Sequence, residues 1–480
     1  MGVSKGLTAI ACAAAGLMSV VACERDPDPS RVAPAATSVT VASGPALDSA
    51  PAPAAAATTV AAAAGPGPGD WGTLTDVCGP REGGDTAVDA SGGDTQGIGA
   101  TSIAVGTIAD PGFAGSPGLN QEIFDAATAF VGWCNRAGGI NGRQLELTTY
   151  DAALTNYQPV VEQACGHEFA IVGDGAVQDN LWPSVGAACG LIDVAGFSVT
   201  GAKAGKAGRT PAEERTVQAV PNPSDRLPVA ADLLLDAAFP DAAARTGIIW
   251  ADFQTTVEQA DKERAALSQL GHQIVYENVF NVLGEANWTP FAVALKDAGV
   301  RFLRFVGDVE NAARFQDALQ EIGYRPEVVV QETNFYDRNY LSAGGEAIEG
   351  TFVRTVFSPF EEADQNPATS RYLDEIARVH GKTAVLGLQS TSAWLLFATL
   401  AKRCDLAGTL TRSCILEQAS SVTEWDGGGL HAPGDPAHNL PPSCVAVVQV
   451  QHGEFVRWAP DHGYSCPDGA VAELGGSGSG

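Results

Sequence analysis

Two stretches of the chain carry residue types at a spacing that could do catalytic chemistry. Gly196-Phe-Ser-Val-Thr-Gly201 comes close to the sharp turn that presents a nucleophilic serine, but its second glycine stands one residue too late. Gly173-Asp-Gly175 follows an apolar run as a dinucleotide-binding turn does, yet Gln178 occupies the place of the third glycine. No zinc-protease, P-loop or EF-hand pattern occurs. We therefore predict neither a catalytic residue nor a cofactor.

Two aspartates and two histidines near the C-terminus could gather around a metal ion. They are Asp426, His431, Asp435 and His438. The segment that holds them is rich in glycine and proline, and such a composition is typical of an ordinary loop. We therefore predict no metal site.

The cysteines point to an oxidising compartment. Apart from Cys12 and Cys23 near the N-terminus, eight remain: Cys78, Cys134, Cys165, Cys189, Cys404, Cys414, Cys444 and Cys466. None stands in a Cys-x-x-Cys pair or beside a histidine at metal-ligand spacing, which favours disulfides over zinc. We expect them to pair in chain order, 78 with 134, 165 with 189, 404 with 414 and 444 with 466, although spacing alone does not prove the connectivity.

The N-terminus has the pattern of an export signal. Lys5 precedes the uncharged apolar run Gly6–Ala22, which is short for a membrane span and ends in small residues. We predict a signal peptide over residues 1–22, with a short transmembrane anchor as the alternative. Val20-Val-Ala-Cys23 resembles a bacterial lipobox, so Cys23 is the predicted lipidation site. The protein is then exported and held on the outer face of a cell membrane.

Both ends of the chain lack the large apolar side chains that a core needs. Residues 23–69 begin with Cys23 and are rich in Ala, Pro, Thr, Ser and Gly, which predicts a disordered linker between anchor and folded body. Residues 471–480 end in Gly and Ser and are predicted to be a flexible tail.

Length and charge limit the function classes. A chain of 480 residues is too long for one hydrophobic core, which favours two lobes. Lys plus Arg number 28 against 56 Asp plus Glu, a net charge of -28. Because this charge repels phosphate backbones, we exclude nucleic acid as a partner.

Short β-rich runs alternate with amphipathic helices from about residue 98. A strand over 98–108 precedes a helix that begins at Asn120 and ends at Gly138-Gly139, and a strand follows over 144–150. After residues 201–223 the same rhythm starts again, with a helix expected over 224–238. Strands that alternate with helices at this spacing form parallel sheets. We therefore predict an α/β fold with two Rossmann-like lobes.

Several phrases resemble the type I periplasmic binding proteins. They are Asp110-Pro-Gly-Phe-Ala-Gly, the run Ala137-Gly-Gly-Ile-Asn-Gly-Arg-Gln-Leu-Glu-Leu147 with the following Asp151, and Ile348-Glu-Gly-Thr-Phe-Val353. The similarity covers roughly residues 98–460 and is strongest to the leucine/isoleucine/valine-binding group of ABC-transporter receptors. It implies parallel-sheet lobes joined by a three-strand hinge. Lobe I is expected over 98–219 plus 357–430 and lobe II over 220–356 plus 431–470.

The resemblance places a ligand in the cleft between the lobes, at the carboxyl ends of the strands, where open α/β sheets bind ligands in general. The expected lobe I contacts are Phe113, Gly175, Ala176, Val177, Gln178, Phe197, Ser198 and Thr200. Ser198 and Thr200 look like the family's Ser/Ala-x-Thr ligand loop, although their hydroxyls could instead only cap a helix or turn.

Lobe II is expected to contribute residues that directly follow its strands. They are Trp250, Asp252, Phe253, Asp308, Asn334 and Phe335. Aromatic rings grip the body of a small ligand with little loss of entropy. Trp250 could also be a core residue at the end of a strand, and the aspartates could be solvated loop acids.

The resemblance implies a solute-binding protein, not an enzyme, that delivers its ligand to the permease of an ABC transporter. One departure from the branched-chain group is Thr255-Thr256-Val257, where that group often has Tyr-Gly, which puts an amino acid in doubt. Amides, urea and aromatic acids are further ligands of the family. A ligand sensor of the same fold and an exported hydrolase are the alternatives.

Overall fold

A computed structural model describes residues 67–81 and 93–475. The predicted signal peptide, the lipidation site Cys23 and nearly all of the linker lie outside the described residues. All the described residues fall within one compact unit that spans residues 63–480. In this part of the chain, no helix combines the length and the apolar character that a bilayer crossing requires.

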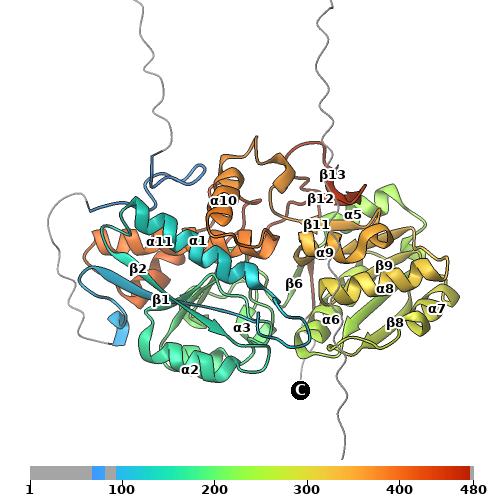
Figure 1. The fold of residues 1–480 in the computed structure, drawn as a ribbon, viewed down its shortest axis with the longest axis horizontal. Coiled ribbons are helices and arrows are strands. Elements are labelled where there is room, and N and C mark those ends of the chain that lie inside the picture. Colours follow the sequence, from blue (N-terminus) through green and yellow to red (C-terminus); the bar gives the residue numbers. More distant parts are fainter. Residues whose placement is uncertain (1–66, 82–92, 476–480) are drawn as a thin grey trace, which may run out of the picture. The chain divides into compact units, whose positions relative to one another are not determined.

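The first sheet is entirely parallel and has the strand order β2-β1-β3-β4-β5. Its strands are β1 (Ser102–Ala109), β2 (Gln144–Asp151), β3 (Ala170–Val172), β4 (Ile192–Ala195) and β5 (Thr216–Gln218). Helices α1 (Gln121–Ala137) and α11 (Val385–Leu406) pack on one face, and α2 (Tyr157–His167) packs on the other (Figure 1). Figure 1 shows this layered arrangement, which we call lobe I.

Helix α1 has the ends that the sequence predicts. Asn120 precedes it with a left-handed backbone, and Gly138 ends it with φ 118° and donates its N–H to the carbonyls of the last turn. Glycine adopts this backbone without the steric cost that a Cβ would add. The predicted apolar face is buried, with Phe130 and Cys134 completely inaccessible to solvent.

The second sheet has the order β13-β12-β11-β10-β9-β7-β8, and it forms lobe II with its helices. Strands β7 (Thr246–Ala251), β8 (Ile274–Phe280), β9 (Phe302–Val306), β10 (Val328–Gln331) and β11 (Phe352–Thr355) run parallel. The hairpin β12 (Ala446–Gln451) and β13 (Glu454–Ala459) adds two antiparallel strands. Side chains alternate along β9, so Phe302 and Val306 face α5 (Ala230–Ala238) and α6 (Gln254–Gln269), whereas Leu303 and Phe305 face α7 (Thr289–Asp297) and α8 (Val309–Glu321).

The helix expected over 224–238 is shorter than predicted. Residues 226–228 form strand β6 (Arg226–Pro228), and α5 begins only at Ala230. Pro228 explains the difference, because proline inside a helix removes a hydrogen bond and clashes with the preceding turn.

The prediction of a flexible tail from residue 471 is wrong for its first residues. Val471–Glu473 form strand β14, which pairs antiparallel with β6. Ala472 and Leu474 are buried against Leu227, Val229 and Ala266. These apolar contacts stabilise a segment whose glycine-rich continuation alone suggested disorder.

Four disulfides join the eight cysteines in chain order: Cys78–Cys134, Cys165–Cys189, Cys404–Cys414 and Cys444–Cys466. The first attaches the segment 67–81 to α1. Trp71 of this segment packs on Phe130 and Trp133 with ring centroids 6.2 and 4.9 Å apart. Trp71, Val77 and Cys78 of this segment therefore belong to the core of lobe I.

Three segments connect the lobes. The chain leaves lobe I after β5, returns after β11 to α10 (Pro367–Arg378), α11 and α12 (Arg412–Ala419), and leaves again before β12. Two of the segments run antiparallel, because Ser358 donates its N–H to Leu430 and Ala432 donates its N–H to Val356. A cleft between the lobes is therefore bordered by paired backbone.

Candidate functional site

A cavity of about 250 Å³ lies between the two lobes. Its wall combines loops that follow β1, β3 and β4 in lobe I, loops that follow β7, β9, β10 and β11 in lobe II, and the connecting segments around Val220 and Pro442. These are the carboxyl ends of the parallel strands, where the fold leaves backbone groups and side chains free to meet a ligand.

Asp110 positions the lobe I wall. Its carboxylate is fully buried and accepts hydrogen bonds from the N–H groups of Leu154 and Val177, each at 2.7 Å. Burial raises the pKa of Asp110, while the two N–H groups oppose that shift. Three loops that line the cavity are thus tied to one side chain.

A second buried carboxylate holds the neighbouring loop. Asp179 accepts from the N–H groups of Val199 at 2.8 Å and Thr200 at 2.9 Å, and from the Thr200 hydroxyl. Burial raises the pKa of Asp179 to about 6. Beneath this loop, the Lys203 ammonium lies 2.7 Å from Asp174 and 2.7 Å from Asp193, and all three side chains are inaccessible to solvent. The buried charges therefore support the loop that presents Phe197 and Val199 to the cavity.

Part of the lobe II wall consists of residues at the start of helices that follow strands. Phe253 precedes α6 at the N-cap position, and Asp308 precedes α8. The Asp308 carboxylate accepts from the N–H groups of Glu310 at 3.1 Å and Asn311 at 3.0 Å, so it caps the helix. Phe335 is buried and packs edge-on against Tyr340.

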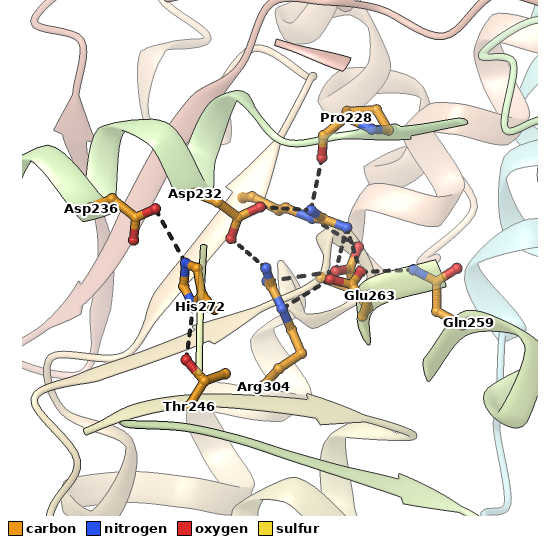
Figure 2. A network of polar contacts seen from close by, with 10 residues as sticks. Pro228, Asp232, Asp236, Thr246, Gln259, Glu263, His272 and Arg304 are labelled. Carbon is orange, nitrogen blue, oxygen red and sulfur yellow. Dashed lines mark hydrogen bonds and ion pairs between the residues drawn. The ribbon is translucent and has the colours of Figure 1, made fainter. Parts of the chain in front are cut away.

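A buried ion cluster reaches the cavity from lobe II. Figure 2 shows Arg304 between Asp232 of α5 and Glu263 of α6. Arg354, which lines the cavity, donates to Glu332 at 2.9 Å and Glu263 at 2.8 Å. Two guanidinium groups thus face three carboxyl groups. Burial raises the pKa of Glu332 to about 7 against the opposing effect of Arg354.

His431 lies on a connecting segment with a defined tautomer. Its Nδ1–H donates to the carbonyl of Ala432 at 2.8 Å, and its Nε2 accepts from the Ser392 hydroxyl at 2.8 Å. The Ser392 oxygen in turn accepts from the Trp425 indole at 2.9 Å. A protonated His431 could not accept from Ser392, and burial lowers the pKa of His431 to about 4.

We expect folding free energy to depend on pH through His431. Unfolding returns the imidazole to an ordinary pKa near 6.5, so the contribution is complete above that pH and is lost as pH falls toward 4, by about 3 kcal/mol. Urea unfolding between pH 7 and 4 measures the slope. His431→Gln should flatten it, whereas the exposed His438→Gln should not; equal slopes in both variants would contradict the assignment.

Comparison with known proteins agrees with this geometry. Residues 102–454 match a family model described as periplasmic binding protein. The chain belongs to the periplasmic binding protein family. It has the family's type I fold, whose members are solute-binding proteins that act outside the cytoplasm. The curated proteins, in contrast, include no match to this sequence.

Solved structures with the same fold share little sequence. A fatty acid ABC transporter substrate-binding protein from Thermomonospora curvata is 14% identical with a TM-score of 0.65, over 78% of this chain and 95% of that one. A leucine-binding protein from Thermotoga maritima MSB8 is 16% identical with a TM-score of 0.60, over 74% and 98%. An extracellular ligand-binding receptor from Rhodopseudomonas palustris HaA2 is 16% identical with a TM-score of 0.61, over 75% and 100%. These likenesses concern the fold.

Half of the residues expected at the ligand site of this periplasmic binding protein line the cavity. They are Phe113, Val177, Phe197, Phe253, Asp308, Asn334 and Phe335. Each of them lies within five residues of the end of a strand, so strand ends located the cavity wall in the sequence.

Four of the other lobe I candidates contact protein groups or are buried, and they do not line the cavity. Gly175 accepts at its carbonyl from Asn120 at 3.0 Å, and Ala176 is packed in the core. Thr200 donates its hydroxyl to the Asp179 carboxylate and makes no side-chain cap at the start of the following helix, so the alternative role of a helix cap does not describe it. Ser198 is buried, and its hydroxyl has no partner among the described residues.

Three further candidates stand beside the cavity without lining it. Gln178 is half-buried next to Val177. Trp250 packs in the lobe II core and under Arg264, whose guanidinium lies 5.3 Å from the ring centroid. Asp252 is exposed and accepts from the N–H of Val282 at 2.6 Å. The alternative roles of strand-end core residue and loop acid thus describe Trp250 and Asp252.

The glycine turn at Gly173 and the Asp/His group near the C-terminus do not have the geometry of a phosphate site or a metal site. Gly173 faces α11, since a Cβ there would meet the Trp394 indole nitrogen at 2.4 Å, which leaves no room for a phosphate. Within residues 67–81 and 93–475, no three His, Cys, Asp or Glu side chains come close enough together to hold a metal ion. His438 instead pairs with Asp435 at 2.8 Å.

Sequence reasoning missed Glu332, Arg354, Thr255, Leu386 and Gln389, which also line the cavity. An arginine inside the apolar strand Phe352–Thr355 was the available signal for Arg354, because a buried cation needs partners. Leu386 and Gln389 lie on α11, which is apolar along most of its length, and no local pattern separates cavity-facing from core positions there.

Proposed function

We propose that this protein is an extracytoplasmic solute-binding lipoprotein that captures a small molecule in the interlobe cavity and delivers it to an ABC transporter. The observation that carries the proposal is the cavity itself, whose wall is divided between two lobes joined by three connecting segments. Family membership supports the same function.

The divided wall provides a mechanism for capture. The binding free energy of a ligand is most favourable when both walls contact it. Those walls present Phe113 and Phe197 from lobe I and Phe253 and Phe335 from lobe II. It therefore shifts the hinge equilibrium toward the arrangement that encloses it, and only that differential affinity can drive closure. A transporter that recognises the enclosed arrangement receives loaded protein in preference to empty protein.

We propose ligand contact for Phe113, Val177, Phe197, Phe253, Asp308, Asn334 and Phe335. Gly175, Ala176, Gln178, Ser198, Thr200, Trp250 and Asp252 would support these residues from behind. The boundaries 98–219 plus 357–430 and 220–356 plus 431–470 remain our proposed lobes, with β14 added to lobe II.

The export signal and the lipid on Cys23 complete the proposal. A tethered protein stays near the permease that it serves, and residues 23–69 would provide the reach. A Cys23→Ser variant that still fractionates with membranes would contradict the anchor without touching solute binding.

The test is a thermal-shift screen of the full chain against amino acids, amides, ureas, aromatic acids and apolar solutes. A ligand that binds only the folded state raises the melting temperature by mass action. Phe253→Ala should weaken the hit by about 2 kcal/mol, roughly thirtyfold, because an aromatic anchor is lost. Phe291→Ala, a half-buried phenylalanine on α7 away from the cavity, is the matched control. A hit that is insensitive to Phe253→Ala would place binding elsewhere and contradict the proposal.

A further inference from the structure

We infer that lobe I has a binding site of its own for an ammonium or guanidinium group, on the face of its sheet that α2 covers. A hollow of about 460 Å³ lies there, between the C-terminal end of α2 and strands β1 and β2. Ala104 of β1, Glu146 and Tyr150 of β2, and Glu168 at the end of α2 line it. None of the residues around this hollow lines the interlobe cavity, so a ligand here would not depend on the hinge.

Strand β1 leaves room for a buried carboxylate at the base of the hollow. Glu168 ends α2, and the following Phe169 donates its N–H to the Ala104 carbonyl at 2.8 Å, which brings the chain onto the sheet. Gly106 has no side chain, and a Cβ there would meet Tyr150 Cε2 at 2.8 Å and Glu168 Cγ at 3.3 Å. The Glu168 side chain therefore lies over β1, in space that a larger residue at position 106 would need.

One oxygen of this carboxylate lacks a partner. Glu168 is 1% exposed, and its Oε1 accepts from the Tyr150 hydroxyl at 2.7 Å. Burial and this hydrogen bond raise the pKa of Tyr150, so the phenol keeps its proton and donates it. The nearby Arg412 donates to the backbone carbonyls of Glu168 and Phe169. Oε2 has no hydrogen-bond partner among the described residues. A buried carboxylate oxygen without a donor is costly, so a ligand that supplies a donor is stabilised there.

The charges around the hollow define the ligand class. Glu168 at its base and the exposed Glu146 supply two carboxylates, His167 lies exposed beside them, and no lysine or arginine lines the hollow. Throughout residues 67–81 and 93–475, no three His, Cys, Asp or Glu side chains are placed to hold a metal ion. An ammonium or guanidinium group carries both the positive charge and the N–H donors that Glu168 Oε2 lacks.

Calorimetric titration of the full chain with three probes of similar length tests the ligand class. Agmatine carries an ammonium and a guanidinium group, 1,4-butanediol is neutral, and succinate is an anion. Agmatine should bind about tenfold more tightly than the other two, because hydrogen bonds to a charged group are the stronger ones. Equal or tighter binding of 1,4-butanediol or succinate would overturn the inference, as would the absence of agmatine binding.

Glu168→Gln separates this site from a general attraction of cations to a chain of net charge -28. The change keeps the shape and leaves an oxygen for the Tyr150 hydroxyl, and it should weaken agmatine about tenfold. Glu162→Gln removes the same charge from an exposed position of α2 outside the hollow, and it should weaken agmatine less than about twofold. Equal losses in the two variants would assign agmatine to the overall charge and overturn the inference. Phe253→Ala should leave agmatine binding unchanged, whereas a loss there would place agmatine in the interlobe cavity and also overturn it.

Tyr150→Phe tests the carboxylate from the opposite side. The change removes the donor of Glu168 Oε1 and frees a second oxygen, so agmatine should bind about twofold more tightly. A tenfold loss in Tyr150→Phe would show that the phenol holds the cation and would overturn the assignment to Glu168. The blocked peptide acetyl-Gly-Arg-Gly-amide identifies the source of the group. Binding tighter than that of agmatine would support the site and assign it to an arginine of a partner protein, and weaker binding would support a free organic cation.

Discussion

Replacing Lys203 with methionine should cost about 4 kcal/mol of folding free energy, although the side chain touches no ligand. Its ammonium lies 2.7 Å from both Asp174 and Asp193 in a region without solvent. Burial alone opposes the charge, but the two carboxylates outweigh it and raise the pKa of Lys203 well above its ordinary value. Methionine has a similar length and removes only the charge, so the carboxylates are left buried without a cation.

The folding free energy lost in Lys203→Met should be larger at high pH than at low pH. Without Lys203 the pKa of Asp179 should rise further, since Lys203 is the main group that lowers it. An acid whose pKa is higher in the folded than in the unfolded state stabilises the fold at low pH and loses that contribution as pH rises through the folded value. Lys203→Met should therefore be closer to the parent protein at pH 5 than at pH 8 in urea unfolding.

Lys206→Met provides the control for Lys203→Met. Lys206 lies three residues away and is exposed, so its removal should change the free energy of unfolding by less than about 0.5 kcal/mol. If the two variants were equally stable, the buried ion pairs of Lys203 with Asp174 and Asp193 would contribute nothing to folding. The conformation of the loop at Val199 would then need another explanation.

Arg304→Met should have an effect of similar size in lobe II, about 4 kcal/mol. Arg304 is inaccessible to solvent and pairs with Asp232 and with Glu263, the latter at 3.2 Å. It occupies a core-facing position of β9 between Phe302 and Val306, so methionine fits the space and isolates the loss of charge. Arg354 would then face three carboxyl groups alone.

Arg301→Met at the start of the same strand segment is the matched control. Arg301 is 40% exposed and its pair with Glu327 is solvated, so its removal should cost less than about 1 kcal/mol. Combining Arg304→Met with Asp232→Leu should restore part of the loss, because a buried carboxylate is removed together with its cation. A double variant less stable than Arg304→Met would show that Asp232 acts mainly through Arg354.

The two buried ion clusters, one around Lys203 and one around Arg304, lie next to residues that line the cavity. Lys203 supports the loop of Phe197 and Val199, and the Arg304 cluster extends through Arg354 and Glu332 to the surface of the cavity. Loops that bind a ligand must keep their shape without regular hydrogen-bond ladders. Buried, mutually satisfied charges impose such a shape, since any rearrangement would separate them.

The sequence by itself determined the features that depend on neighbouring residues. The period of apolar residues set the alternation of strands and helices, Asn120 and Gly138 set the ends of α1, and the even cysteine count anticipated disulfides. The position of the interlobe cavity at strand ends also followed, because a parallel sheet with short connections brings those ends to one edge. These inferences use local physics, which a chain reveals residue by residue.

Only the tertiary structure decided which side chains face the cavity. Phe253 lines it and its neighbour Asp252 does not, and Thr200 turns its hydroxyl to Asp179. Strand β14 and the cluster of Asp232, Glu263, Arg304, Glu332 and Arg354 join residues far apart in the chain. Such contacts depend on how elements pack in three dimensions, and the spacing of residues along one strand or helix carries no record of a partner more than a hundred residues away.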